Sequence, residues 1–318
     1  MICGFIAEHR SRFGVAPICR VLTEHGCKIA PRTFHAWASR APSKRALWDT
    51  VITSMLAGYY EPDEHGRRAP ESLYGSVKMW AHLNRQGIQV AKCTVERLMR
   101  ANRWQGVRRV TKVRTTVADP AADRAPDLVK RRFRAPAPCR LLVADFTYVR
   151  MANGCFAYTA FVIDAYANRI VGWECATSKE TTFVESAIRQ AVALRTREGH
   201  PGGDVTHHSD AGSQYTSVHF GETLLLAGMQ PSIGSVGDAF DNALAETTIG
   251  LYKHECIRAD SPFRRGPLDR LSDLEMITAD WVHWYNTSRL MHHLGRIPPT
   301  EAEANYYATS DGRPAAHT

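Results

Sequence analysis

Three carboxylate residues, Asp145, Asp210 and Glu246, stand where a charged side chain could do chemistry. Asp145 interrupts the apolar run LLVADFTYV, and a charge inside a strand is costly unless it is paired or binds a metal ion. Asp210 ends the short run VTHHSD, and Glu246 lies one turn into a helical pattern. Converging carboxylates repel one another unless divalent cations neutralise them, and their hard oxygens suit Mg²⁺ or Mn²⁺. Two such ions, about 4 Å apart, could activate a water or hydroxyl and stabilise the leaving oxygen of a phosphodiester.

The segment GDAFDNALAETTIGLYKHE, residues 237–255, carries further acids whose roles must be separated from that of Glu246. The ordinary explanation for any single acid is a solvated helix face. Asp241 and Asn242 are expected to start the helix as N-cap residues. Asp238 is expected in the preceding loop, and Glu255 in a structural role.

Asp164 and two histidines near the predicted strand ends also have two explanations each. Asp164 could be a fourth metal ligand, but an aspartate that forms a turn is favoured. One of His207 and His208 could orient a phosphate or a water, and a core histidine is an equal alternative.

The elements that must position these residues follow from the hydrophobic patterns. Strand patterns cover 140–150, 155–167 and 169–177, and turn residues separate them. Further along, helix and strand patterns alternate over 181–199, 204–210, 216–228, 229–235 and 242–255. Three strands followed by this alternation predict an α/β core with a mixed five-stranded sheet.

Small all-α domains are predicted before this core. Short helices over residues 1–40 are compatible with a helix-turn-helix. Residues 72–104 fit better, because Lys92, Arg97 and Arg100 point outward on the second helix, the usual groove-reading arrangement. The alternative is a helical hairpin with solvated lysines and arginines.

The charge of the chain is distributed unevenly. The net charge is +8, and residues 101–140 hold eleven Lys or Arg against three Asp. Residues 141–256 hold seven basic and thirteen acidic residues. A basic arm beside an acidic core suits a protein that holds polyphosphate, although a solvated linker would have the same composition. The arm supplies five predicted DNA contacts: Arg108, Arg109, Arg131, Arg132 and Arg134.

Several other classes of protein are disfavoured. No run of about 18 apolar residues predicts a transmembrane helix, and the start of the chain lacks a signal-peptide pattern. The eight cysteines form no CxxC pair, so neither a zinc knuckle nor a disulfide framework is indicated. These features favour a cytoplasmic protein with reduced thiols.

Three motifs resemble, in order, the catalytic core of retroviral-integrase-like DDE transposases: VADFTYV, HHSDAGSQYTS and GDAFDNALAETTIGLYKHE. The 35 residues between Asp210 and Glu246 give the D(35)E spacing of that family. YGSVKMWAHLNRQGIQVAKCTVERLMR resembles the helix-turn-helix before the core, and WYNTSRLMHHLGRIPPTE the segment that closes it. The group resembled is the OrfB product of bacterial two-frame insertion sequences, over residues 70 to 305.

The resemblance implies an RNase-H-like core in which Asp145, Asp210 and Glu246 are catalytic and bind two Mg²⁺ (or Mn²⁺) ions. Water would cleave a strand at a terminal inverted repeat, and the freed 3′-hydroxyl would attack another phosphodiester. Asn242 and Lys253 share the helix face of Glu246, so both are expected to contact DNA, with a plain surface lysine as the alternative for Lys253.

The resemblance also implies partners and a division of the chain. The partners are the element's terminal repeats, target DNA, a second copy or more of the chain and an OrfA-type product, but no membrane. The predicted parts are an N-terminal helical segment (1–45), a helix-turn-helix domain (46–104), a basic linker (105–139), the catalytic core (140–258) and a C-terminal helix with a tail (259–318).

Three rival functions are compatible with parts of this pattern. A nuclease of the same fold would only hydrolyse DNA. An inactive regulator would bind DNA without chemistry, although the intact acidic triad argues against it. A glycosidase with paired carboxylates would leave the basic arm and the helix-turn-helix patterns unexplained.

Overall fold

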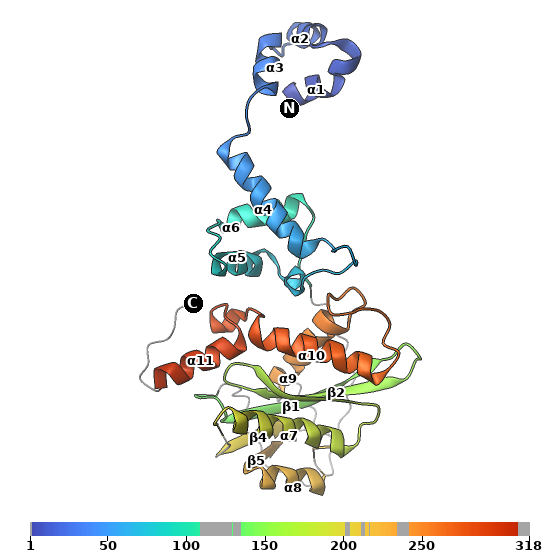
Figure 1. Ribbon diagram of the computed structural model, residues 1–318, viewed down its shortest axis with the longest axis vertical. Helices are drawn as coiled ribbons and strands as arrows, with labels where there is room; N and C mark the ends of the chain where they lie inside the picture. The colour runs from blue at the N-terminus through green and yellow to red at the C-terminus, as the bar shows by residue number, and fades with distance from the viewer. Residues whose placement is uncertain are drawn as a thin grey trace. The chain divides into compact units, whose positions relative to one another are not determined.

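The computed structural model describes residues 2–108, 129, 135–200, 204–210, 214–215, 217–233 and 242–310 (Figure 1). The chain forms two compact units, Met1–Leu56 and Ala57–Thr318. The finer five-part division stays a prediction, and the predicted tail beyond residue 310 lies outside the described residues.

The first unit contains three short helices around a small apolar core. These are α1 (Ile2–Phe13), α2 (Val15–Glu24) and α3 (Pro31–Ala38). Ile6, Ile18, Cys19 and Phe34 form the core. Gly14 has a φ of 77°, a left-handed conformation that glycine adopts without strain, and it separates α1 from α2.

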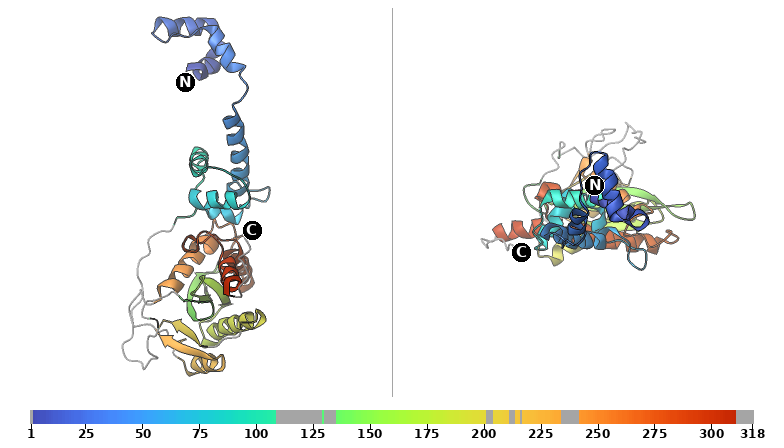
Figure 2. Two further views of the ribbon diagram at one scale, coloured as in Figure 1. Left: turned by 90° about the vertical axis from the view of Figure 1, so that its left-hand side faces the viewer. Right: turned by 90° about the horizontal axis from the view of Figure 1, so that it is seen from above.

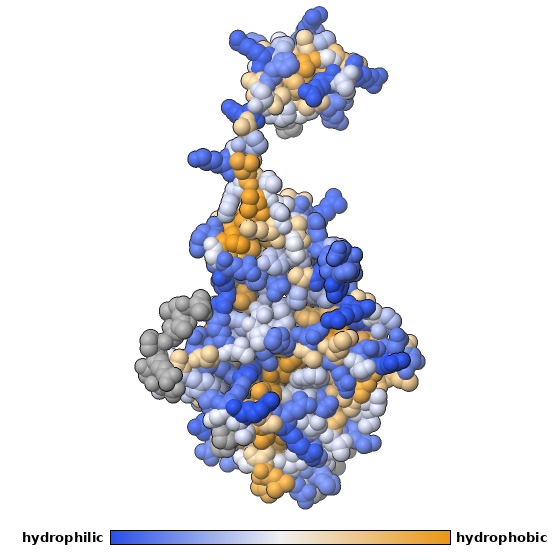
Figure 3. Space-filling view, viewed as in Figure 1, coloured by the Kyte–Doolittle hydropathy of each residue, from blue (hydrophilic) through white to orange (hydrophobic). Residues whose placement is uncertain are grey.

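A longer helix, α4 (Lys44–Tyr60), begins in the first unit and ends in the second. The sequence patterns did not predict it, because its apolar residues surround the helix instead of forming one stripe. Ile52 and Leu56 are buried, whereas Leu47, Trp48, Val51 and Met55 are exposed. Figure 3 shows this apolar surface along α4.

The second unit opens with the predicted helix-turn-helix, formed by α5 (Ser76–Arg85) and α6 (Lys92–Ala101) after the short helix η1 (Pro70–Leu73). The Trp80 indole donates a hydrogen bond of 2.9 Å to the Val90 carbonyl and closes the turn. Val95, Leu98 and Met99 are buried, as the amphipathic pattern of α6 predicts.

The core contains the predicted mixed sheet of five strands, in the order β3-β2-β1-β4-β5. The strands are β1 (Leu141–Arg150), β2 (Phe156–Asp164), β3 (Arg169–Ala176), β4 (Val205–Ser209) and β5 (Met229–Ile233). β1 and β2 pair antiparallel, as do β2 and β3, whereas β4 is parallel to both β1 and β5. This arrangement confirms the predicted α/β architecture.

Helices cover both faces of the sheet, and the layers can be followed in Figure 2. On one face, α7 (Thr181–Arg197) and α8 (Val218–Leu226) pack on a core that includes Ala144, Val162 and Phe220. Gly172 on β3 allows α7 to approach closely, because a β-carbon there would collide with the Ala187 carbonyl. On the other face, α9 (Ala243–Tyr252) contacts β1, and α10 (Leu271–Thr287) contacts β3.

The C-terminal aromatics pack α10 onto the sheet, as predicted. Trp281 and Tyr285 are buried, and the Trp281 ring centroid lies 5.9 Å from that of Phe161 on β2. After η3 (His292–Leu294), a final helix α11 (Pro299–Ser310) follows. In the described part of the chain, no helix has the length and apolarity that crossing a membrane requires.

Candidate active site

Asp145 lies in β1, and Asp210 directly follows the neighbouring parallel strand β4. Ala144 of β1 pairs with Ser209 of β4, and each of these residues is followed directly by one of the aspartates. Neighbouring strands lie about 4.8 Å apart, so the backbones of the two aspartates are adjacent. Asp145 is half-buried, whereas Asp210 is exposed where β4 ends. The paired strands therefore bring together two of the three predicted catalytic residues.

Glu246 lies in the first turn of α9, and the start of that helix is fixed to β1. The Asn242 amide donates a hydrogen bond of 3.1 Å to the carbonyl of Ala144, the residue before Asp145. The Glu246 amide donates to the Asn242 carbonyl at 3.0 Å. Asn242 thus links the strand that carries one predicted acid to the helix that carries another, while the Glu246 side chain is exposed.

Asn242 begins α9, as predicted, and its side chain has a partner that the sequence did not indicate. The residue does stand at the N-cap position of α9, but its side chain makes no capping hydrogen bond there. It is buried and directed to the β1 backbone. The side-chain amide therefore links the start of the helix to β1, and contact of Asn242 with DNA stays a prediction. Asp238 and Asp241 lie outside the described residues.

The donor chemistry of Asp145, Asp210 and Glu246 fits hard divalent cations, since all three supply carboxylate oxygens. In the described ranges, no group of three or more His, Cys, Asp or Glu side chains is already arranged to hold a metal ion. The strand register and the Asn242 link bring the three residues to the middle of β1, but the three side chains do not form a closed ligand set.

Tyr215 and His207 are both buried near this position. Tyr215 is buried between Phe146 and Phe220, with ring centroids 6.1 and 5.3 Å away. Burial raises the pKa of its hydroxyl, and the negative charges of Asp145 and Asp210 raise it further. His207 is also buried, which lowers its pKa to about 3 and keeps the ring neutral. Their sequence patterns show aromatic residues near an acid but cannot show this burial.

His207 therefore belongs to the core, and His208 is buried as well. The Nδ1 atom of His208 lies 2.9 Å from the Ser232 hydroxyl of β5. Of the two explanations for this pair, the structure supports core histidines.

Asp164 belongs to a buried ionic cluster and not to the candidate site. It pairs with Arg195 of α7 at 2.6 Å, and Arg195 pairs with Glu303 of α11 at 2.7 Å. The Asp164 carboxylate also accepts hydrogen bonds from the amides of Cys139 and Tyr166, the second of which forms the expected turn. The carboxylate therefore links the end of β2 to α7 and, through Arg195, to α11.

Lys253 directly follows α9 and lies against an aromatic ring of β1. Its Nζ atom is 4.7 Å from the centroid of the Tyr148 ring. The residue is half-buried, seven positions beyond Glu246 on the same helical segment. Contact with DNA phosphate by Lys253 stays a prediction, and its cation–π contact with Tyr148 was not foreseen.

The predicted DNA-binding residues of the helical region are exposed where the structure describes them. Lys92, Arg97 and Arg100 lie on the exposed side of α6, and Arg108 is exposed after the helix. The arm residues Arg109, Arg131, Arg132 and Arg134 lie outside the described residues.

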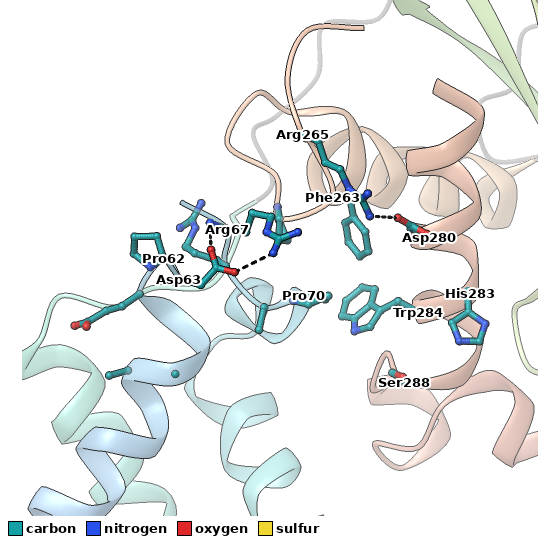
Figure 4. A pocket seen from close by; sticks show the side chains of 16 residues that line it. Pro62, Asp63, Arg67, Pro70, Phe263, Arg265, Asp280, His283, Trp284 and Ser288 are labelled. Atoms are coloured by element: carbon teal, nitrogen blue, oxygen red, sulfur yellow. Dashed lines mark hydrogen bonds and ion pairs between the residues drawn. The ribbon is translucent and has the colours of Figure 1, made fainter. Parts of the chain in front are cut away.

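A separate cavity of about 900 Å³ lies between the loop before η1 and helix α10 (Figure 4). Arg67 pairs with Asp63 at 3.4 Å, and Arg265 pairs with Asp280 at 3.2 Å, so charges of opposite sign neutralise each other at its walls. None of the three predicted catalytic acids lines it.

Comparisons with known proteins match the same regions. A family described as Integrase core domain matches residues 135–239, and a second family of that description matches residues 227–299. An HTH-like domain matches residues 63–112.

Whole-chain relatives have also been identified. The chain is 49% identical over 289 residues to the protein of Mycobacterium tuberculosis assigned as the transposase of insertion sequence element IS986/IS6110, covering 91% of this chain and 99% of that relative. It is 43% identical over 305 residues to the transposase for insertion sequence element IS629 of Shigella sonnei, covering 94% and 95%. Among solved structures, the HTLV-2 integrase catalytic core domain in complex with magnesium aligns with a TM-score of 0.39 at 18% identity, covering 50% of this chain and 93% of that one.

Proposed function

This chain belongs to the insertion-sequence transposases with an integrase core domain, and we propose that Asp145, Asp210 and Glu246 are its catalytic carboxylates. The observation that carries the proposal is the matched register of Asp145 and Asp210 beside the Asn242 link to α9. β1, the end of β4 and α9 then supply three acids near the middle of β1, which acids scattered over the surface would not do.

The proposed reactions are cleavage and joining of DNA strands at the element's ends. In the first, water attacks a phosphodiester and leaves a 3′-hydroxyl on the element. In the second, that hydroxyl attacks another phosphodiester, so one phosphate ester bond forms as another breaks. The first joining would connect the element's two ends, and a later one would insert the element into target DNA.

The three carboxylates would hold Mg²⁺ or Mn²⁺, which when bound supplies activation of the attacking oxygen and charge stabilisation of the leaving oxygen. The contribution of the chain is positional. β1 and β4 fix the spacing of Asp145 and Asp210, and the Asn242 hydrogen bond fixes where the helix bearing Glu246 begins. Lys253 would hold a DNA phosphate two helical turns beyond Glu246.

The helical region would bind the DNA that the core cuts. Lys92, Arg97 and Arg100 on α6 would enter a groove of the terminal repeat, and the arm arginines would track phosphates. Two ends must be brought together, so a dimer or larger assembly on DNA is expected, with an OrfA-type product as a further partner. Chromosomal DNA as substrate would place the protein in the bacterial cytoplasm.

A strand-joining assay tests this function against the nuclease and the inactive regulator. The intact chain is incubated with Mg²⁺ and labelled DNA that carries the two ends of its element. Joined products longer than either substrate are expected. Shortened products alone would indicate a nuclease, and unchanged DNA that is nevertheless bound would indicate a regulator.

A further inference from the structure

Two large aromatic side chains are exposed at the far end of the β1–β2 hairpin. Tyr148 is 56% exposed and Phe156 is 49% exposed. They are diagonal neighbours across the strand pair, and their ring centroids lie 5.2 Å apart with the planes at 79°. Two adjacent aromatic rings that are exposed to water do not gain the free energy of burial. A ligand that covers them would provide it, so such a pair on a surface indicates a binding role.

Positive charge lies beside this pair. Lys253 holds its ammonium group 4.7 Å from the Tyr148 ring centroid, and Arg150 is exposed at the end of β1. Register places Arg150 directly opposite Phe156. Aromatic faces next to cations match the chemistry of a nucleotide, because the base stacks on the ring and the phosphate pairs with the cation.

The strand and the helix that carry the predicted acids both lead to this pair. Tyr148 lies three residues beyond Asp145, which is about 10 Å along a strand. This odd spacing places the two side chains on opposite faces of the sheet, so a DNA strand that contacts both passes around the edge of β1. Lys253 lies seven residues beyond Glu246, also about 10 Å along a helix. At a rise of 3.4 Å per nucleotide, that distance corresponds to about three nucleotides of a DNA strand.

The edge of β1 is open over this stretch. Pairing with β4 covers only Leu141 to Ala144, so from Asp145 to Arg150 the described part of the sheet offers no strand on that side. Lys253 follows α9 on the other face, and its Nζ atom lies 4.7 Å from the Tyr148 ring centroid. A DNA strand at the predicted acids could follow the same edge.

We propose that Tyr148 and Phe156, with Lys253 and Arg150 beside them, stack on an unpaired DNA base about three nucleotides from the phosphodiester that is cut. The base must be unpaired because the faces of bases within a duplex are already stacked on their neighbours. The proposal rests on the proposed function, since it places the scissile phosphate at the three acids. An aromatic surface of this kind could instead receive a second copy of the chain, and the test includes that outcome.

The test uses full-length protein carrying Glu246→Gln, so that DNA is bound without being cut. The DNA is an element end with a fluorescent adenine analogue at one of the first six positions from the cleavage site, either paired or left unpaired by a mismatch. Stacking on an aromatic ring quenches the fluorescence of the analogue. Quenching and affinity are measured for the parent and for the Tyr148→Leu, Phe156→Leu and Tyr148→Phe variants. Leu226→Ala, at an exposed apolar position on α8, is the matched surface control.

The parent is expected to bind the unpaired end about 10-fold more tightly than the paired end, since stacking of one base contributes of that order. Quenching should peak near the third position. Tyr148→Leu and Phe156→Leu should lose both the preference and the quenching while keeping affinity for paired DNA, whereas Tyr148→Phe and Leu226→Ala should keep both.

Retention of quenching and preference in Tyr148→Leu and Phe156→Leu would overturn the proposal. The proposal would also be overturned if Tyr148→Leu and Phe156→Leu changed only the molar mass of the protein in solution and left DNA binding and quenching unchanged. That result would identify the aromatic pair as a contact between copies of the chain. Failure of the proposed function would give a different result. The unsubstituted chain would then produce no joined DNA in the strand-joining assay, independently of the quenching data.

Discussion

Glu246 and Glu255 lie nine residues apart on one uninterrupted helical segment, yet their surroundings are opposite. Glu246 is exposed in the first turn of α9. Glu255 is buried in the π-helical continuation, Lys253–Ile257, and its carboxylate accepts hydrogen bonds of 2.6 and 2.9 Å from the Arg289 guanidinium. The Trp281 indole donates to the same carboxylate at 3.3 Å. Glu246 is thus accessible to a ligand, whereas Glu255 forms a buried ion pair within the fold.

These surroundings predict opposite effects of the same substitution. Glu246→Gln should abolish strand joining and leave the unfolding midpoint unchanged, because no buried contact is lost. Glu255→Gln should lower the free energy of unfolding by about 3–5 kcal/mol, because the buried Arg289 charge loses its partner. Thermal unfolding and the strand-joining assay are run on both variants. Equal unfolding midpoints for the two variants would contradict the assignment.

Asp145→Asn and Asp210→Asn should each reduce cleavage and joining to the level seen without protein. Each substitution removes a negative charge needed to hold a divalent cation but keeps nearly the same volume, so folding and DNA affinity should persist. Asp204→Asn, an exposed aspartate at the start of β4, is the control and should keep full activity. Full activity in either test variant would show that a different acid serves the reaction.

The sequence was sufficient to predict the sheet and the elements that carry the acids, because strand alternation and helix periodicity are local patterns. The sequence also predicted different roles for the two glutamates. The D(35)E spacing indicated a catalytic role for Glu246, and a position beyond Lys253 indicated a structural role for Glu255. Register was not available from the sequence, because the pairing of Ala144 with Ser209 joins segments 65 residues apart. That pairing is what makes Asp145 and Asp210 neighbours.

Other features depended on contacts that no local pattern encodes. Asn242 stands at the N-cap position of α9, as predicted, but its side-chain amide bonds to Ala144 of β1, 98 residues away. Tyr148 occupies an ordinary strand position, and its exposure between the buried residues Thr147 and Val149 depends on what packs on each face of the sheet. α4 was not predicted, because its apolar residues lie on several sides of the helix and do not form a single apolar stripe.

Removal of divalent metal should stop the reaction and leave DNA binding by the helical region intact. Mg²⁺ or Mn²⁺ should restore joining after treatment with EDTA. Ca²⁺ should permit assembly on DNA without chemistry, because its larger and looser coordination misplaces the reacting oxygens. Gel-shift and strand-joining assays on the same samples measure the two effects. Robust joining in EDTA would exclude the proposed metal dependence.

His207 should make the protein sensitive to acid. Its pKa is about 3 in the folded protein, where burial and the nearby His208 disfavour the charged form, against 6.5 when exposed. Between these two values the unfolded chain binds a proton that the folded chain does not. The contribution of His207 to the free energy of unfolding is therefore fully present above pH 6.5. It decreases as the pH falls toward 3, by up to about 1.4 kcal/mol per pH unit.

Denaturant unfolding at a series of pH values tests this prediction. His207→Leu should flatten the decrease of stability between pH 6 and 4 relative to the parent, whatever its effect at pH 7. His65→Gln, at an exposed histidine, should keep the slope of the parent. An unchanged slope in His207→Leu would mean that another group governs the acid response.

Two sets of basic residues should affect DNA binding in different ways. Replacing the arm residues Arg131, Arg132 and Arg134 with Ala should weaken binding to every DNA sequence alike. The salt dependence should flatten by up to about three units, since each phosphate contact contributes about 0.9 to the slope. Replacing Lys92 and Arg97 on α6 should instead reduce affinity for the element's ends more than for scrambled DNA, because groove contacts set sequence choice.

Binding titrations on terminal-repeat and scrambled DNA, each at several salt concentrations, separate the two effects. Lys92 and Arg97 lie on the exposed side of α6. The buried residues of that helix are Val95, Leu98 and Met99, so the double variant should retain the helix. Circular dichroism of the double variant checks that expectation. If Lys92→Ala/Arg97→Ala lost equal affinity for both DNAs, α6 would serve as a backbone clamp and sequence choice would have to come from another element. If the arm variant bound both DNAs as the parent does at every salt concentration, the basic segment would be a solvated linker.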